Sequence, residues 1–481
     1  MSIRDKVVNG VLWNAFERFS TQGIQLVLTI FIARLLSPSD YGLIAMLSIF
    51  MAVAQAFVDS GFTNALIQNK GRTEKDYATM FFFNIFAASL VYFLLFCMAP
   101  WVACFYSQPE LTSILRVYSL VLIINSFASV HMTRLTIELN FRKQALVSIW
   151  AVVISGFIGL WMAYHGFGVW TLVYQALIFS LVWTLMLSLQ TKWIPKSFFS
   201  YASFRSLFTY GSKLLVSGML HTICTHMYSL TIGKFFMPDI LGYFNRAFAL
   251  GQFPVQNLGN IMHWVTFPIL CNYQNDEEKF NSLITSYLRV SAFLLYPLMV
   301  GMAVLAVPLI SVVLTDKWLP TAPLLQILCF AMMWHPAMQI NVSILDAKGR
   351  SDYHLKSEII KKLMAVLILC VTLPMGIPLV CMGIVVYNLF DFIIVVAFSS
   401  RLTSITFLNQ LKMLMPIWGL SLAMGVVVLM SSICFTLPVA KLLSGIVVGI
   451  FFYGFLAYWL KFQELELLIS LVRRKEEKKA S

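Results

Sequence analysis

Charged residues are scarce in this chain of 481 residues: Asp, Glu, Lys and Arg make up 11% of it, against about 25% in typical soluble domains. Hydrophobic residues make up 59%, and the mean hydropathy is +0.82. No stretch is polar enough for a separate soluble domain, because apolar runs of about 20 residues recur from end to end. The composition excludes a soluble globular protein and indicates an integral membrane protein built from helices.

The chain also lacks the short motifs of the common catalytic classes. No Gly-rich phosphate loop with Lys and Ser or Thr is present, so we do not expect the chain to hydrolyse ATP. HExxH, nucleophile-elbow and paired-Cys motifs are absent as well, and the eight cysteines lack metal-ligand spacing. We therefore expect a protein that is not an enzyme and has no cofactor, with H⁺ or Na⁺ as the only coupling ions to consider.

Apolar periodicity predicts about fourteen transmembrane helices. The predicted spans are 13–36, 41–60, 78–98, 113–136, 144–164, 168–189, 213–236, 247–271, 287–314, 321–345, 358–374, 378–398, 413–433 and 437–460.

The excess of basic over acidic residues, 34 against 21, follows the alternation of these spans. With a cytoplasmic N-terminus, most Lys and Arg residues fall on the cytoplasmic side, as the positive-inside rule requires. We therefore expect both termini in the cytoplasm and no nucleic-acid partner.

An internal repeat divides the spans into halves. Residues 33–42, ending in Pro38 and Gly42, are echoed 200 residues later by residues 233–242, ending in Pro238 and Gly242. The two copies end the first and the seventh span. Internal repeats commonly place a transporter's site at their interface.

This repeat predicts an all-α membrane protein with two six-helix lobes and two further helices. The predicted segments are an N-lobe at 1–189, a cytoplasmic amphipathic linker at 190–212, a C-lobe at 213–400, two helices at 401–460 and a basic cytoplasmic tail at 461–481.

Polar residues follow one face of the first, second, seventh and eighth spans. Arg18 stands out because a charge within an apolar span is costly unless it faces a bundle interior or water. These four spans could line a hydrated cavity whose cations attract an anionic substrate. The candidate cations are Arg18, Lys213, Lys234, Arg246 and Arg34, and the candidate polar residues are Gln22, Gln25, Gln55, His221, Asn245, Gln256 and Asn260.

Other roles are open for several of these side chains. Arg18 could instead lie near the cytoplasmic surface, paired with the neighbouring Glu17. Arg34, Lys234 and Arg246 lie near helix ends, where basic side chains commonly extend to lipid head groups. Asp59 and Asp391 could couple transport to protons or sodium, or could be a helix-terminal carboxylate and a structural intramembrane pair.

The residues resemble a known family. Residues 33–42 (ARLLSPSDYG), followed by Asp59, Ser60, Gly61 and Phe62, are similar to bacterial lipid-linked oligosaccharide flippases, particularly of the colanic-acid exporter (Wzx-like) type. Further matches are Lys317 with Trp318, residues 322–326 (APLLQ), and Gly349, Arg350 and Asp352 with Lys356. These flippases belong to the multidrug/oligosaccharidyl-lipid/polysaccharide exporter superfamily, whose twelve-helix core agrees with the repeat.

The resemblance implies a secondary transporter in the bacterial inner membrane. It would move undecaprenyl-pyrophosphate-linked repeat units across that membrane by alternating access, for exopolysaccharide, capsule or O-antigen synthesis. It also implies that Arg18, Lys213, Lys234 and Arg246 hold the pyrophosphate or acidic sugars. The implied partners are membrane lipids, the lipid-linked substrate, and a polysaccharide polymerase with its chain-length regulator.

Two alternative functions stay open. One is a cation-coupled exporter of small molecules or drugs on the same fold. The other is a membrane glycan polymerase or ligase, which the short outer loops disfavour, because an enzyme acting on outer-face substrates needs a sizeable loop to form its site.

Overall fold

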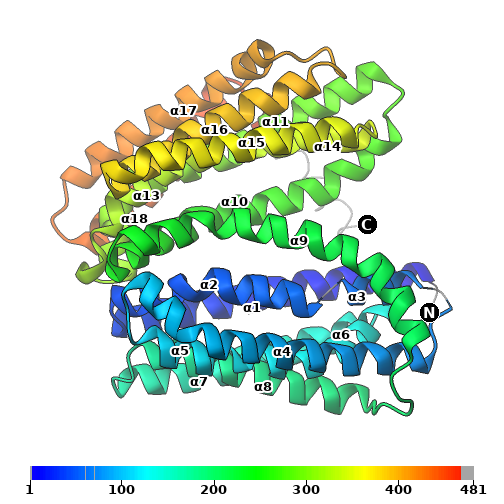
Figure 1. The fold of residues 1–481 in the computed structure, drawn as a ribbon. Helices are drawn as coiled ribbons and strands as arrows, with labels where there is room; N and C mark the ends of the chain where they lie inside the picture. The colour runs from blue at the N-terminus through cyan, green and yellow to red at the C-terminus, as the bar shows by residue number, and fades with distance from the viewer. Residues whose placement is uncertain (1–2, 60, 70, 467–481) are drawn as a thin grey trace. The chain divides into compact units, whose positions relative to one another are not determined.

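A computed structural model describes residues 3–59, 61–69 and 71–466, with the side chains of 3–12, 14–19, 210, 213, 214, 217, 221, 264 and 265 outside the description. The described residues form α-helices and short 3₁₀ turns and contain no strand. The chain folds into two compact units, Met1–Gly242 and Tyr243–Ser481. Figure 1 shows the helices in chain order from blue to red.

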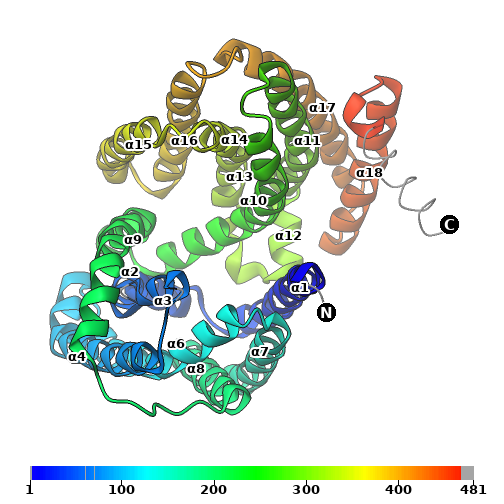
Figure 2. The ribbon, with the colours of Figure 1, turned by 90° about the vertical axis from the view of Figure 1, so that its right-hand side faces the viewer.

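The first unit holds nine complete helices among its described residues. They are α1 (Ile3–Leu35), α2 (Pro38–Asp59), α3 (Phe62–Gln68), α4 (Glu74–Tyr106), α5 (Leu111–Tyr118), α6 (Leu120–Ile137), α7 (Phe141–Tyr164), α8 (Val169–Thr191) and α9 (Tyr201–Phe235). In this unit α1 packs against α7, α7 against α8, α8 against α6, and α9 against α2, α3 and α4. Figure 2 views the unit nearly along these helices.

The second unit contains most of α10 (Pro238–Asn272), whose first turn belongs to the first unit. Its other helices are α11 (Glu277–Val304), α12 (Ala306–Val313), α13 (Thr321–Met332), α14 (His335–Ala347), α15 (Ser351–Thr372), α16 (Ile377–Ser399), α17 (Phe407–Ile433) and α18 (Pro438–Trp459), with 3₁₀ turns at Asp316–Trp318 and Leu373–Met375. The closest packing is α11 against α17, α17 against α18, and α16 against α13 and α15.

Each predicted span overlaps one helix or two consecutive helices. Within the described residues, ten helical segments are long and apolar enough to cross a membrane. Of α1, the part Ser20–Leu35 is apolar but shorter, and α9, α10 and α15 are not among the ten segments. The prediction of an all-helical, multi-pass membrane protein is confirmed.

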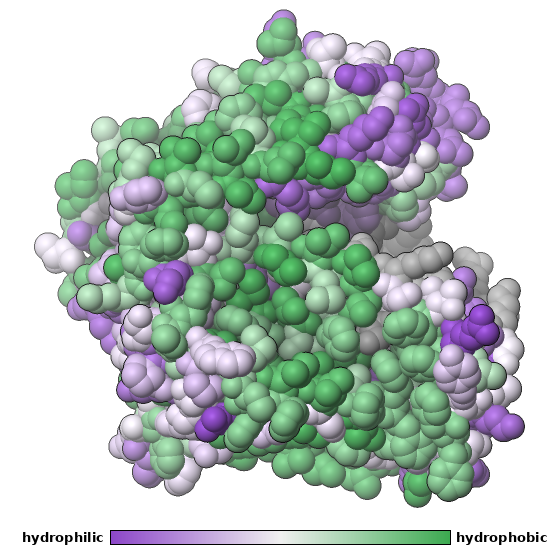
Figure 3. All heavy atoms as spheres, in the orientation of Figure 1, coloured by the Kyte–Doolittle hydropathy of each residue, from purple (hydrophilic) through white to green (hydrophobic). Residues whose placement is uncertain are grey.

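Hydrophobic side chains cover the sides of the helices rather than only the interior of each unit. On the face shown in Figure 3, hydrophobic residues cover α15 and α16, and hydrophilic residues gather where α15 begins. Leu363, Leu367 and Val371 of α15 are each at least 60% exposed. In water such a row would be an interaction or aggregation surface, whereas in a bilayer it faces lipid tails.

The connection between α8 and α9 is anchored in the first unit. Residues 192–200 are not helical, and α9 runs without interruption from Tyr201 to Phe235. Trp193 and Leu207 pack into the same buried cluster as Phe62 and Met80. Packing therefore places α9 in the first unit.

Candidate functional site

The repeated turn begins α2 with a reciprocal cap. The backbone N–H of Ser37 donates to Asp40 Oδ2 at 2.8 Å, and the N–H of Asp40 donates to Ser37 Oγ at 3.2 Å. This is the geometry of a capping box, which satisfies backbone donors that the first turn of a helix leaves open. Pro38 occupies the first helical position, where its missing N–H costs nothing. The motif thus fixes where α1 ends and α2 starts.

The two copies of the repeat contact each other within the first unit. A Cβ atom added to Gly42 would lie 1.7 Å from the carbonyl oxygen of Pro238, and one added to Gly242 would lie 2.0 Å from the carbonyl oxygen of Pro38. The first turns of α2 and α10 therefore pack backbone against backbone, in a reciprocal arrangement. Only glycine allows this approach. The four-residue spacing places the proline at the start of each helix and the glycine where the other helix comes closest.

The polar face of α1 is described from Ser20 onward, so Arg18 lies outside the described side chains. Gln22 is half-buried, while Gln25 and Arg34 are exposed. Gln25 and Thr29 line a cavity of about 340 Å³ that is also bounded by α6, α7 and α8. The structure therefore brings one predicted site residue, Gln25, together with polar residues from three other helices.

Two predicted residues of α2 are bonded to each other. Gln55 Nε2 donates to Asp59 Oδ1 at 3.0 Å, one helical turn apart. Asp59 ends the helix, and its side chain is exposed. A carboxylate at a helix C-terminus is unfavourable for the helix dipole, so this position is not explained by the stability of α2. Its proposed coupling role stays a prediction.

On α9, the side chains of Lys213 and His221 lie outside the described residues. Lys234, in the last turn, donates a hydrogen bond to the carbonyl oxygen of Phe105, and its ammonium lies 4.6 Å from the centre of the Phe105 ring. This contact holds the end of α9 against the end of α4. The role of Lys234 in substrate binding stays a prediction.

In the second unit, the predicted residues of α10 follow one another along the helix. The guanidinium of Arg246 lies 5.6 Å from the centre of the Trp318 ring, within reach of a cation–π interaction. Asn245 and Asn260 are half-buried, and Gln256 is exposed. Trp318, one of the residues that resemble the flippase family, is thus the aromatic partner of the predicted site cation Arg246.

Asp391 of α16 lies in a buried charge cluster. Its Oδ1 is 3.3 Å from the ammonium of Lys361 on α15, which is also paired with Glu358. The side chains of Lys361 and Asp391 are only 6% and 15% exposed. Buried charges need such partners because desolvation costs several kcal/mol per ion. Asp391 therefore forms an ion pair within the helix bundle. Such a pair is one of the two roles that the sequence analysis gives for this residue, and the other, coupling to protons or sodium, stays a prediction.

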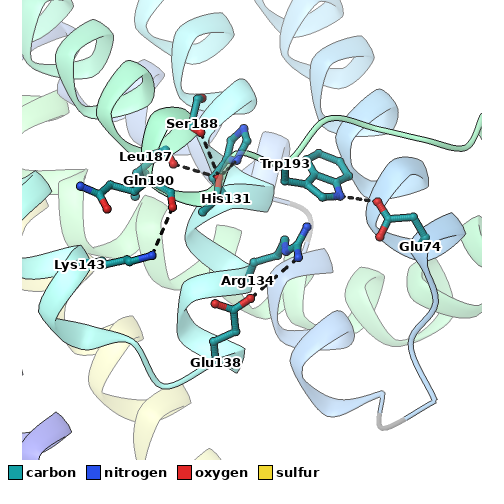
Figure 4. Close-up of polar contacts among 10 residues, drawn as sticks. Glu74, His131, Arg134, Glu138, Lys143, Leu187, Ser188, Gln190 and Trp193 are labelled. Atoms are coloured by element: carbon teal, nitrogen blue, oxygen red, sulfur yellow. Dashed lines mark hydrogen bonds and ion pairs between the residues drawn. The ribbon is translucent and has the colours of Figure 1, made fainter.

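A second polar cluster fixes the start of the α8–α9 connection, as Figure 4 shows. The indole N–H of Trp193 donates to Glu74 of α4, and Thr191 Oγ1 lies 2.6 Å from His131 Nδ1 of α6. Lys143 of α7 donates to the carbonyl oxygen of Gln190 at 3.4 Å. This cluster joins α4, α6 and α7 to one end of α8, so we interpret it as structural.

Sequence reasoning missed several of these residues. The cavity beside α1 also contains Asn125, Ser155, Gln175 and Ser180, and the charge cluster contains Lys361 and Glu358. Gln175 and Asn125 are isolated carboxamides in apolar spans, a signal that was present but has no repeating pattern. Lys361 looks like a basic residue near a cytoplasmic helix end, and only its packing between helices reveals its burial.

A family of known proteins matches more than half of the chain. Residues 31–323 match the family described as "Polysaccharide biosynthesis protein". This region includes both copies of the repeat and all of α2 to α12.

Curated relatives agree with this match. The chain is 24% identical over 356 residues to the Bacillus subtilis "Teichuronic acid biosynthesis protein TuaB", covering 73% of each chain. It is 24% identical over 367 residues to the Escherichia coli "Lipopolysaccharide biosynthesis protein WzxC", covering 75% of this chain and 74% of that protein. The Rhizobium meliloti "Succinoglycan biosynthesis transport protein ExoT" is also 24% identical, covering 68% and 66%.

Solved structures share the fold. The inward closed conformation of the lipid II flippase MurJ superposes with a TM-score of 0.72 and 17% identity, covering 94% of this chain and 99% of that one. An inward-facing multidrug resistance transporter of the MATE family, in the MOP superfamily, gives a TM-score of 0.59 and 16% identity, covering 83% and 95%. The fold is that of the MOP superfamily, and by its sequence match the chain belongs to the polysaccharide biosynthesis protein family.

Proposed function

We propose that this protein is a flippase that moves undecaprenyl-pyrophosphate-linked oligosaccharide repeat units across the bacterial inner membrane by alternating access. Family membership over residues 31–323 carries this proposal. It is supported by relatives whose names refer to teichuronic acid, lipopolysaccharide and succinoglycan, and by the fold shared with a lipid II flippase. The products would enter surface polysaccharides outside the cell.

The proposal includes an orientation with both termini in the cytoplasm, based on the distribution of basic residues. It assigns the pyrophosphate or acidic sugars to Arg18, Lys213, Lys234 and Arg246, with Arg34 as a further cation. A cation attracts such groups at long range and can bind them by charge-assisted hydrogen bonds. A polymerase and a chain-length regulator would use the translocated units.

Coupling of transport to H⁺ or Na⁺ is part of the same proposal. Asp59 is the stronger candidate of the two carboxylates, because its described partner is the neutral Gln55, whereas Asp391 is paired with Lys361. A carboxylate already neutralised by a buried lysine gains less from binding a cation.

Deletion of the gene in its host tests the function. We expect loss of the surface polysaccharide and accumulation of lipid-linked repeat units at the cytoplasmic face, both restored by the wild-type gene. Unchanged polysaccharide would refute the proposal. The likeness to a MATE transporter keeps drug export as the second candidate, so a drug-sensitivity panel belongs in the same experiment.

A further inference from the structure

Half of the described residues that line the cavity beside α1 are polar, and none of these described residues is charged. Its lining of twelve residues includes three carboxamides and three hydroxyls, contributed by four helices of the first unit. The polar residues are Gln25, Thr29, Asn125, Ser155, Gln175 and Ser180. Figure 2 shows the four helices, α1, α6, α7 and α8, in the same part of that unit.

Most of these polar groups are not used by the protein itself. Among the described residues, the carboxamides of Gln25, Asn125 and Gln175 and the hydroxyls of Thr29 and Ser180 form no hydrogen bond. Ser180 is only 3% exposed. An unpaired polar group in an apolar bundle costs free energy, so the arrangement favours water or a hydrogen-bonding ligand in the cavity.

Close helix packing fixes the walls of the cavity. A Cβ atom added to Gly156 of α7 would lie 2.0 Å from Leu28 Cδ1 of α1, and one added to Gly159 would lie 3.1 Å from Gln175 Cγ of α8. Glycine thus lets α1 approach α7 and leaves room for the Gln175 side chain against the α7 backbone. The carboxamide is held by packing rather than by a hydrogen bond, and it stays available to a ligand.

Size and chemistry together identify the ligand class. A volume of 340 Å³ corresponds to about eleven water molecules at ~30 Å³ each, which is enough for one hexose ring together with several water molecules. Carboxamides both donate and accept, as sugar hydroxyls do, and Phe179 adds an aromatic wall. A desolvated metal cation would fill little of this space and would find no carboxylate among the lining residues.

We propose that this cavity is a subsite for an uncharged sugar residue of the transported glycan, with Gln25, Asn125 and Gln175 as its hydrogen-bonding residues. The inference rests on the proposed flippase function, and it assigns the charged and the uncharged parts of the substrate to different groups of residues. The cations proposed above recognise the charged parts of the substrate. The carboxamides select a hydroxyl-rich, neutral ring, because a site built for hydroxyl groups rejects ligands that leave its polar groups unpaired.

The test is binding of free sugars to the full-length protein in nanodiscs, measured by saturation-transfer difference NMR. The probes are glucose, galactose and N-acetylglucosamine, compared with glucuronate, inorganic pyrophosphate and NaCl. We expect at least one neutral sugar to bind, and Gln175→Leu and Asn125→Leu each to weaken its binding about 3- to 10-fold, as expected for one lost hydrogen bond. Gln190→Leu is the matched control, because Gln190 lies on the same helix with an exposed side chain.

Two results would overturn the subsite: no neutral sugar binds, or binding is unchanged in both cavity variants while their thermal unfolding matches the wild type. Displacement of the bound sugar by NaCl would contradict it as well, in favour of a cation site. Translocation of a lipid-linked oligosaccharide by the same preparations is measured separately. Absence of translocation by the wild type would refute the flippase function, whereas the subsite is decided by sugar binding alone.

Discussion

Replacement of Gly42 by alanine tests whether the two repeats depend on their mutual contact. The new Cβ would lie 1.7 Å from the carbonyl oxygen of Pro238, whereas carbon–oxygen contacts are normally about 3.3 Å or longer. The first turns of α2 and α10 must then separate by roughly 1.5 Å. Both contacting groups are backbone, so no side-chain rotation can relieve the clash.

Overpacking of this kind costs about 1–3 kcal/mol. For a unit of about 240 residues, this lowers the melting temperature by ~2–12 °C. Thermal unfolding of the purified protein in nanodiscs measures the shift, and export of polysaccharide in cells measures its consequence. Gly242→Ala should behave in the same way, because its Cβ would meet the carbonyl oxygen of Pro38 at 2.0 Å.

Gly23→Ala is the control, since nothing lies within 4 Å of a Cβ added at this position of α1. Alanine is favoured over glycine within a helix, so this variant should be as stable as the wild type or more so. If Gly42→Ala and Gly23→Ala unfold at the same temperature, the reciprocal backbone contact does not exist as described.

Three further predictions concern charge. Lys361→Met should destabilise the protein by about 3–5 kcal/mol, because it leaves the buried carboxylate of Asp391 unpaired. The double variant with Asp391→Leu should recover most of that loss in thermal unfolding, and no recovery would argue against the pair. The bidentate contact with Arg350 lowers the pKa of the exposed Asp352 to about 2. The contribution of this pair to stability is therefore present above pH 3.8 and is lost as the pH falls towards 2, which NMR titration of Asp352 checks. Asp352→Asn should leave export between pH 5 and 8 unchanged. Arg18→Ala and Lys213→Ala should each reduce export at equal amounts of inserted protein, measured by immunoblot, and wild-type export in both would assign them structural roles.

The helical architecture could be predicted because membrane spans are determined by local composition. A run of about 20 apolar residues specifies a helix wherever it occurs, and the predicted spans all overlap helices of the structure. The repeat could also be seen in the sequence. Pro38 and Pro238 begin α2 and α10, and Gly42 and Gly242 let the first turns of these helices pack against each other, so both copies have the same residues at the same spacing.

The packing between helices could not be predicted in the same way. Asn125 and Gln175 reach one cavity only because α6 and α8 pack together, and the rotation of each helix about its axis depends on neighbours distant in sequence. Lys361 shows the same limit. Its position near a helix end is typical of a basic residue facing water or head groups, yet the packing of α15 on α16 buries it against Asp391.

The central claim is that this chain itself moves a lipid-linked glycan across a bilayer. Purified wild-type protein in proteoliposomes should transfer undecaprenyl-pyrophosphate-linked oligosaccharide from one leaflet to the other, detected by access of an added glycosidase to the sugar. We predict transfer above that of protein-free vesicles, with a reduced rate in Lys213→Ala. Equal accessibility in vesicles with and without the protein would contradict the account.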